Sequence, residues 1–352
     1  MTGFVAGTAK RLTARRALAL LGTGLAMTAV VAVFAVLFGI TTDATGRHVE
    51  LLGNAALEPG TAEHTILWFR ISRVSASLLV GGALAAAGCA LQALLRNPLA
   101  EPFTLGVSSG STLAAVIAIR FGIESAFGDL GVGGAALLGA FATLVLVSRL
   151  ARIGSQLPPA TLVLVGITIA MFCSAASVLI QSTADFVEIA RMVRWMMGGL
   201  DSMRLAPVQQ MVGPIVVGIV VLIAYSRELN ALSAGTEAAA SVGVAVGRTQ
   251  FVVWAVSALL VGAAIALAGP IGFVGLIVPH ALRAIVGPDH RLLIPLSVLG
   301  GGIVLTVCDT VARSLMPWTP LQAGVITPVL GVPFFIVILM RQKRHIGLWS
   351  RG

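Results

Sequence analysis

Charged side chains are scarce in this chain of 352 residues, because Asp, Glu, Lys and Arg together make up only 11% of it. A soluble domain carries about 25% charged residues, since its surface must stay hydrated. Hydrophobic residues reach 57%, and the mean hydropathy is +1.00. The composition therefore excludes an ordinary soluble protein and indicates a chain whose surface faces a lipid bilayer.

Residue types that usually carry chemistry are also rare. The three cysteines lie inside apolar runs and the five histidines are scattered, so neither set predicts a metal site or a catalytic residue. A single tyrosine and the absence of alternating strand patterns argue against an outer-membrane barrel. No GxxxxGKS or GxxxxGKT phosphate loop occurs, so any use of ATP falls to a partner. We expect a chain without enzymatic activity.

Long apolar runs rich in Ala, Val, Leu and Gly recur along the chain. A spanning helix needs roughly 20 apolar residues, and the sequence offers about ten such runs. It therefore predicts an all-α, polytopic membrane protein in which residues 1–352 form a single transmembrane domain. The predicted spans are Ala17–Ile40, Val74–Leu95, Thr104–Phe121, Gly131–Val147, Thr161–Ile180, Val208–Tyr225, Phe251–Ala268, Ile271–Val286, Leu292–Ala312 and Gly324–Met340.

The basic residues indicate how the chain is oriented in the membrane. A basic segment, 1–16, precedes the first span, and the segment 341–352 that follows the last span is basic as well. Because basic residues collect on the cytoplasmic side, both termini and the loop 226–250 are predicted to be cytoplasmic. The same rule explains the formal net charge of +9 without a nucleic-acid partner.

Prolines interrupt two of the predicted spans. Pro270 and Pro279 bracket a short apolar stretch, and Pro328 and Pro333 fall within the last span. Broken helices are tolerated at membrane depth where protein or a water-filled cavity satisfies the freed backbone groups. The breaks therefore favour a transporter over a simple membrane anchor.

The longest cytoplasmic loop, 226–250, contains a helix-favouring stretch. Residues Thr236–Ser241 are small or helix-forming, and Gly243 follows as a stop signal. An interfacial helix that lies on lipid favours Lys or Arg on its polar face, whereas this stretch offers Glu237 among small residues. The segment therefore suits a groove in a partner protein better than a lipid surface.

Three arginines lie at the predicted outer side, where basic residues are unexpected. Arg70 and Arg73 precede the second span, and Arg313 ends the ninth. They are either interface anchors or partners for acidic side chains of an external protein, for which the forked guanidinium is well suited. Asp309 is the only acidic residue predicted inside a span, and its i, i+4 spacing predicts a local ion pair with Arg313.

Five segments are distinctive and follow one another over nearly the whole chain. They are residues 70–111, which include RNPLAEP, then RWMMGGL at 194–200, GTEAAASVGVAVGR at 235–248, GPIGFVGLIVPHALRAIVGPDHR at 269–291 and GVITPVLGVPFF at 324–335. In this order they resemble the FecCD-type permease subunits of ABC importers for iron(III)-siderophores, haem and cobalamin. The resemblance implies a type II importer permease fold with ten spans.

The resemblance also implies an assembly. Two such permeases, identical or different, pack side by side around a central path. Two ABC ATPase subunits bind at the cytoplasmic face and hold ATP and Mg, so this chain is expected to bind no cofactor itself. A soluble substrate-binding protein docks on the extracytoplasmic side.

Individual residues acquire roles through the same resemblance. By position in the family, the residues in or beside the ATPase groove are Glu237, Ser241 and Gly243. The residues that meet acidic side chains of the binding protein are Arg70, Arg73 and Arg313. The cytoplasmic gate is formed by Asn97 and Leu99, with Pro159 and Ala160 opposite. The chain departs from the family at the second part of this gate, where hydroxyl-bearing residues are expected.

The expected function is import of an iron(III)-siderophore across the cytoplasmic membrane of a bacterium. Cobalamin and haem are the alternatives within the family, because the external binding protein largely sets the specificity. A secondary transporter driven by an ion gradient belongs to a different class and needs intramembrane carboxylates. The sequence offers only Asp309 for that role, next to Arg313.

Overall fold

Helices dominate the computed structural model, which describes residues 14–43, 46–51, 58–154, 156–200, 205–315 and 321–346. The long or apolar helices are α1 (Ala14–Leu37), α2 (Ala62–Leu94), α3 (Val107–Phe121), α4 (Val132–Ala151), α5 (Pro159–Gln181), α7 (Leu205–Ala224), α10 (Val246–Ala268), α11 (Val274–Val286), α12 (His290–Leu315) and α13 (Ala323–Ile346). Shorter elements are β1 (Phe38–Asp43), β2 (Gly46–Leu51), η2 (Pro102–Leu105), η3 (Ile123–Leu130), α6 (Phe186–Met196), α8 (Ser226–Ala234) and α9 (Thr236–Ser241).

The predicted spans are confirmed as helices. Seven helices in the described residues are long and apolar enough to cross a membrane, and three shorter apolar helices, α3, α11 and α13, account for the remaining predicted spans. Each predicted run overlaps one of these helices, because the apolar run itself specifies a membrane helix. The all-helical, polytopic fold class is therefore confirmed.

Two parts of the first outer segment differ from the expectation of a polar loop. β1 and β2 form an antiparallel hairpin directly after α1, with Phe38 opposite Leu51 and Asp43 opposite Gly46. Helix α2 begins at Ala62, where the side chain of Thr61 accepts a hydrogen bond from the backbone of His64 and so caps the first turn. Arg70 and Arg73 consequently lie within α2 and not ahead of it.

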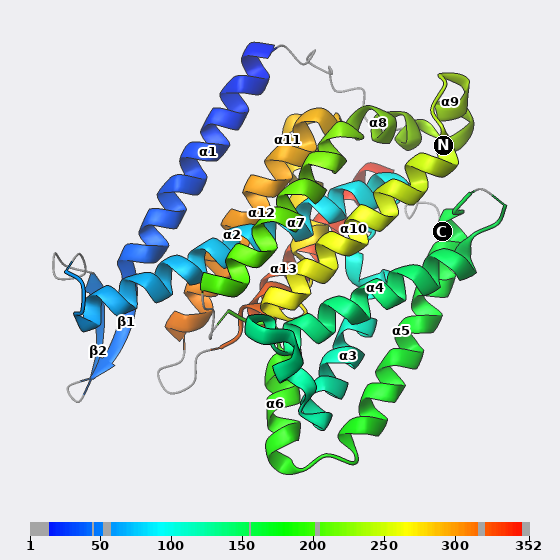
Figure 1. The fold of residues 1–352 in the computed structure, drawn as a ribbon. Helices are drawn as coiled ribbons and strands as arrows, with labels where there is room; N and C mark the ends of the chain where they lie inside the picture. Colours follow the sequence, from blue (N-terminus) through cyan, green and yellow to red (C-terminus); the bar gives the residue numbers. More distant parts are fainter. Residues whose placement is uncertain are drawn as a thin grey trace.

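Helix α2 forms the buried centre of the bundle, and α10, α11 and α12 pack around it (Figure 1). Small residues permit this, because a Cβ atom on Gly81 would lie 2.2 Å from the carbonyl oxygen of Gly301 in α12. Helix α1 differs from α2, since it is almost entirely exposed in the single chain and packs mainly against α12. Its surface faces lipid or a second subunit.

Of the two proline-containing spans, the first is short, as the sequence predicts, whereas the last is one continuous helix, so the break predicted there at Pro328 and Pro333 is wrong. Helix α11 has 13 residues, which at 1.5 Å per residue span only about 20 Å, less than the hydrocarbon core of a bilayer. No helix or strand is assigned between Ala268 and Val274, so α11 starts well inside the bundle after a stretch of irregular chain. Helix α13 contains both Pro328 and Pro333.

Candidate functional site

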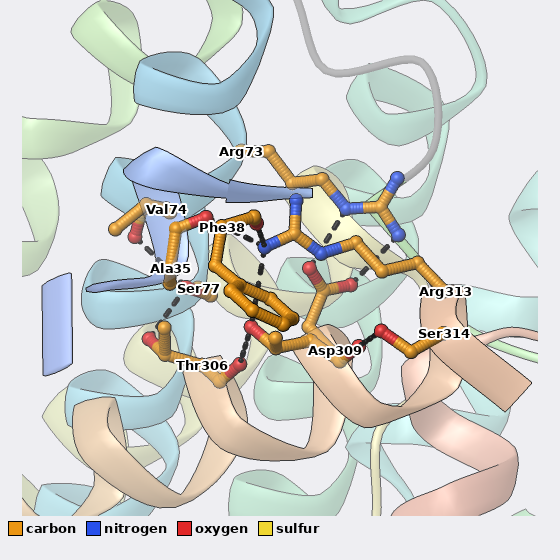
Figure 2. A network of polar contacts seen from close by, with 10 residues as sticks. Ala35, Phe38, Arg73, Val74, Ser77, Thr306, Asp309, Arg313 and Ser314 are labelled. Atoms are coloured by element: carbon orange, nitrogen blue, oxygen red, sulfur yellow. Dashed lines mark hydrogen bonds and ion pairs between the residues drawn. The ribbon is translucent and has the colours of Figure 1, made fainter. Parts of the chain in front are cut away.

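An outer arginine cluster, made of Arg70, Arg73, Asp309 and Arg313, joins α2, α12 and the end of α1. Figure 2 shows Arg73, Asp309 and Arg313 of this cluster. Arg73 donates two hydrogen bonds to Asp309, from Nε to Oδ2 at 2.7 Å and from Nη2 to Oδ1 at 2.8 Å. The Asp309 side chain is 4% exposed and that of Arg73 16%. This bidentate, buried pair is the strong form of an Arg–carboxylate contact.

The predicted ion pair between Asp309 and Arg313 is therefore wrong in its partner. Arg313 points instead at the end of α1, where its Nη2 donates to the carbonyl oxygen of Ala35 at 2.6 Å and to that of Phe38 at 3.3 Å. The last carbonyls of a helix lack intrahelical partners and carry the negative end of the helix dipole, so they attract a cation. Arg73, which faces α12 from α2, takes the carboxylate.

Arg70, which lies one turn before Arg73 in α2, also bonds to the end of α1. Its Nη1 donates to the carbonyl oxygens of Val36 and Leu37 at 3.3 and 3.2 Å, and the residue is only 7% exposed. Two of the three cluster arginines thus hold the end of α1. Asp309 pairs with Arg73, while Arg70 and Arg313 bond to main-chain carbonyls.

The helix predicted at Thr236–Ser241 is confirmed with the same bounds, as α9. Gly243 follows it with a φ of +85°, a conformation that favours glycine, and its N–H bonds back to Ala240. Ala239 alone of the helix is buried, against Leu232 and Val246. The exposed remainder, which we term the coupling surface, is Glu237, Ala238, Ala240, Ser241, Val242 and Gly243.

A polar network that sequence reasoning missed anchors α8, which precedes the coupling helix. Asn230 of α8 donates to Asp289 Oδ1 at 2.8 Å and accepts from the backbone N–H of His290 at 2.9 Å. Arg291 hydrogen-bonds the same carboxylate and lowers the pKa of Asp289 from 3.8 to about 2. The network ties the coupling segment to the start of α12. No local pattern announces it, because 59 residues separate Asn230 from Asp289.

The gate turn, residues 96–101, links α2 to η2. Asn97 and Leu99 are exposed, and Asn97 Oδ1 accepts from the backbone N–H of Leu99 at 2.9 Å, while Ala100 bonds back to the carbonyl of Asn97 at 3.0 Å. Asn stabilises such turns by bonding its own backbone two residues on. Arg96 has a φ of +49°, so the chain reverses sharply at the end of α2.

The residues predicted opposite the gate turn, Pro159 and Ala160, form the first turn of α5. The contact between the two elements runs through η2, which packs against α5. A Cβ atom on Gly166 of α5 would lie 2.9 Å from the backbone of Leu105, so this approach requires glycine. Helix η2, which follows the gate turn, thus packs against the part of α5 around Gly166.

No group of three or more His, Cys, Asp or Glu side chains with metal-site geometry occurs within the described ranges. The three cysteines, Cys89, Cys173 and Cys308, are buried and free. The candidate functional regions described above lie at the two ends of the bundle.

Comparison with known proteins assigns the chain to a family. A family model described as the FecCD transport family matches residues 16–341. The chain belongs to the FecCD transport family. It is 41% identical over 282 residues to the cobalamin import system permease protein BtuC of Halobacterium salinarum, covering 80% of this chain and 74% of that protein. It is 35% identical to the hemin transport system permease protein HmuU of Yersinia pestis, covering 80% and 83%.

A solved structure supports the same assignment. The chain superimposes on a structure described as a metal-chelate type ABC transporter in an inward-facing conformation, with a TM-score of 0.79, 28% identity and coverage of 92% of this chain and 99% of that one. As a FecCD permease, the chain is a multi-pass membrane subunit of an ABC importer in the plasma membrane of a bacterium or archaeon. Permeases of this kind work with ATPase and binding-protein partners.

Proposed function

We propose that this FecCD permease forms, with a second permease subunit, the path through which a metal chelate enters the cell. The observation that carries the proposal is the construction of α12, a helix of 26 residues, about 39 Å long at 1.5 Å per residue. Its first turn binds the coupling segment through His290, and its last turns carry Asp309 and Arg313. One helix therefore connects the two partner-facing ends.

The proposed assembly follows the family pattern. Two ABC ATPases, which hold ATP and Mg, contact the coupling surface, and an extracytoplasmic binding protein meets the outer arginine cluster. Residues 1–352 act as one permease domain, with both termini and the loop 226–250 on the cytoplasmic side. This orientation is supported by the basic segments 1–16 and 341–352 under the positive-inside rule.

In the proposed cycle, the ATPases draw together on ATP binding and push the coupling surface. Because Asn230 and Asp289 tie α8 to α12, movement of the coupling surface is transmitted to α12. The permease pair then exchanges outward- and inward-open states, which is a rigid-body transition between packed arrangements. Asn97 and Leu99, with Pro159 and Ala160, close the cytoplasmic exit.

For the docking contacts, we propose that acidic side chains of the binding protein replace main-chain carbonyls as partners of Arg70 and Arg313. Both arginines bond to carbonyl oxygens at the end of α1. Charged acceptors bind guanidinium groups more strongly than neutral carbonyls do. Arg73 contributes positive potential, while its fork stays on Asp309.

The proposed cargo is an iron(III)-siderophore, with cobalamin as the second candidate. The observation that supports cobalamin is the 41% identity to a permease named for cobalamin import. A secondary transporter receives no support, because Asp309, the carboxylate in the apolar part of α12, is held by a bidentate bond to Arg73.

Uptake measurements test the proposal. Cells that lack the chain are supplied with radiolabelled ferric siderophore, cyanocobalamin or haemin, before and after the chain is restored. We expect one cargo to accumulate only when the chain is present, and uptake to stop when ATP is depleted while the proton gradient is kept. Uptake that follows the proton gradient and ignores ATP would overturn the assignment.

A further inference from the structure

The gate turn contacts α11 at two points, although α11 lies far from it in the sequence. At one end of the turn, the carboxylate of Glu101 accepts a hydrogen bond from the backbone N–H of Phe273, the residue that precedes the first turn of α11. The N-terminus of a helix presents unpaired N–H groups and the positive end of its dipole, so a carboxylate is well placed there. The sequence assigns no role to Glu101.

A second contact lies two turns further along α11. His280 lies beside the backbone of Pro98. Phe273 and His280 are seven residues apart along the chain, which corresponds to about 10 Å along a helix. The peptide from Pro98 to Glu101, which includes Leu99, therefore lies along the first two turns of α11 and is bonded to it through Glu101.

The end of α2, which leads into the gate turn, also packs directly against α11. Gln92 donates from Nε2 to the carbonyl oxygens of Gly275 and Leu276 at 3.4 and 3.2 Å. A Cβ atom on Gly88 would lie 1.9 Å from the carbonyl oxygen of Gly275, so the two backbones are in direct contact. The gate turn and the end of α2 that precedes it thus both pack against the first turns of α11.

Phe273 extends this connection to α13. It adopts a φ of +69°, which is unfavourable for a residue with a side chain and persists where surrounding contacts impose it. Its side chain lies against Gly331, because a Cβ atom there would sit 2.9 Å from Phe273 Cδ1. Gly331 lies between Pro328 and Pro333, inside α13.

We propose that Glu101 is a positioning residue of the cytoplasmic gate. Its carboxylate fixes the gate turn to the N-terminus of α11 and, through Phe273, to α13 at Gly331, so that Asn97 and Leu99 move only when these helices move. The proposal rests on the proposed function in one respect, namely that Asn97 and Leu99 close the exit.

A matched pair of variants separates the hydrogen bond from the bulk of the side chain. Glu101→Gln keeps an oxygen that accepts from Phe273, whereas Glu101→Met has a similar size and no comparable acceptor. Both are made in a chain carrying Leu99→Cys for attachment of a nitroxide spin label. The native cysteines are at most 6% exposed, so the label goes to the gate turn. Glu58→Met, at an exposed position before α2, is the control.

The electron paramagnetic resonance line shape of the label measures how freely the turn moves in the purified complex. We expect Glu101→Met to shorten the rotational correlation time about twofold or more, since local opening increases where a buried contact is lost. Glu101→Gln and the control Glu58→Met stay close to the parent chain. His280→Phe, which removes the imidazole beside Pro98, gives a smaller increase in mobility and serves if Glu101→Met does not fold.

A second readout separates gating from folding. In chains without the label, Glu101→Met lowers the cargo imported per ATP hydrolysed, with cyanocobalamin, haemin and ferric siderophore as probes, and Glu101→Gln restores most of it. An unchanged line shape in both Glu101→Met and His280→Phe overturns the inference. The line shape needs no cargo, so a changed line shape in a complex that imports none of the probes refutes the proposed function and leaves the positioning role standing.

Discussion

The outer arginine cluster and the coupling surface lie at opposite ends of the bundle, and the sequence predicts partner contacts at both. The two regions differ in how far their side chains are already bonded within the single chain. Arg73 is bonded to Asp309, and Arg70 and Arg313 are bonded to the last carbonyls of α1. The coupling surface is exposed, and its small side chains are largely uninvolved in internal contacts. A partner can therefore bind the coupling surface directly, whereas docking at the arginines exchanges existing bonds.

The difference teaches how two kinds of interface are built. A small, flat helix binds by shape and costs the free chain little when no partner is present. A buried cation must be satisfied in every state, because an unpaired buried charge costs several kcal/mol. Under the proposed function, the arginine cluster serves stability and recognition together, while the coupling surface serves recognition alone.

The largest effect is expected where the buried pair is broken. Asp309→Leu leaves Arg73 as an uncompensated charge and should lower the free energy of unfolding by about 3–5 kcal/mol. The double variant Arg73→Met with Asp309→Leu should recover much of this loss, because neither charge then remains. Thermal unfolding in detergent measures both. Equal destabilisation by the single and double variants would show that the pair contributes by packing and not by charge.

The next largest effect concerns the coupling surface. Ala240→Trp places a bulky side chain on its exposed face, and we expect uptake to fall about tenfold or more, since misplacement of about 1 Å at an interface of this kind is costly. The melting temperature should not change, because Ala240 is exposed. Ala284→Trp, an exposed position near the cytoplasmic end of α11, is the control. A normal uptake rate in Ala240→Trp would contradict the placement of the ATPase.

A smaller effect is expected at Arg313. Arg313→Gln keeps a donor for the carbonyl of Ala35 but removes the charge, so the affinity for the binding protein should fall about tenfold, equivalent to one charged hydrogen bond. Arg191→Gln, an exposed arginine of α6, is the matched control. Surface plasmon resonance at two salt concentrations measures both. A loss of the same size in both variants would mean that general charge, and not the cluster, attracts the partner.

The smallest effect concerns the anchor of α8. The pKa of Asp289 lies near 2 in the folded chain, below its ordinary value of 3.8. A depressed carboxyl pKa stabilises the fold fully above about pH 4, and this contribution disappears as the pH falls towards 2. The stability difference between the native chain and Asp289→Asn should therefore stay constant from pH 7 to about 5 and shrink below it. Thermal midpoints across this range provide the measurement.

The spans and the coupling helix were open to prediction because each is encoded locally. An apolar run specifies its own membrane helix, and Thr236–Ser241 lies between Gly235 and Gly243, which set the ends of α9. The arginine cluster was predicted only in part. Its members are recognisable, but Arg73 and Asp309 are 236 residues apart, and nothing in the local pattern chooses Arg73 over Arg313 as the partner.

The same reason explains what the sequence did not reveal about the gate. Asn97 and Leu99 belong to a recognisable segment, whereas the bond from Phe273 to Glu101 joins residues 172 positions apart. Such contacts arise when helices pack, so they depend on the whole bundle. The hairpin β1–β2 was missed because its residues share the polar composition of an ordinary loop.

Reconstitution tests the central claim most directly. The chain is placed in liposomes with its second permease, the ATPases and the binding protein, and entry of cyanocobalamin, haemin and ferric siderophore is followed with ATP supplied on the ATPase side. The account predicts that one of these chelates accumulates with ATP, without an ion gradient, and that Ala240→Trp abolishes accumulation. Accumulation driven by an ion gradient in the absence of ATP would contradict it.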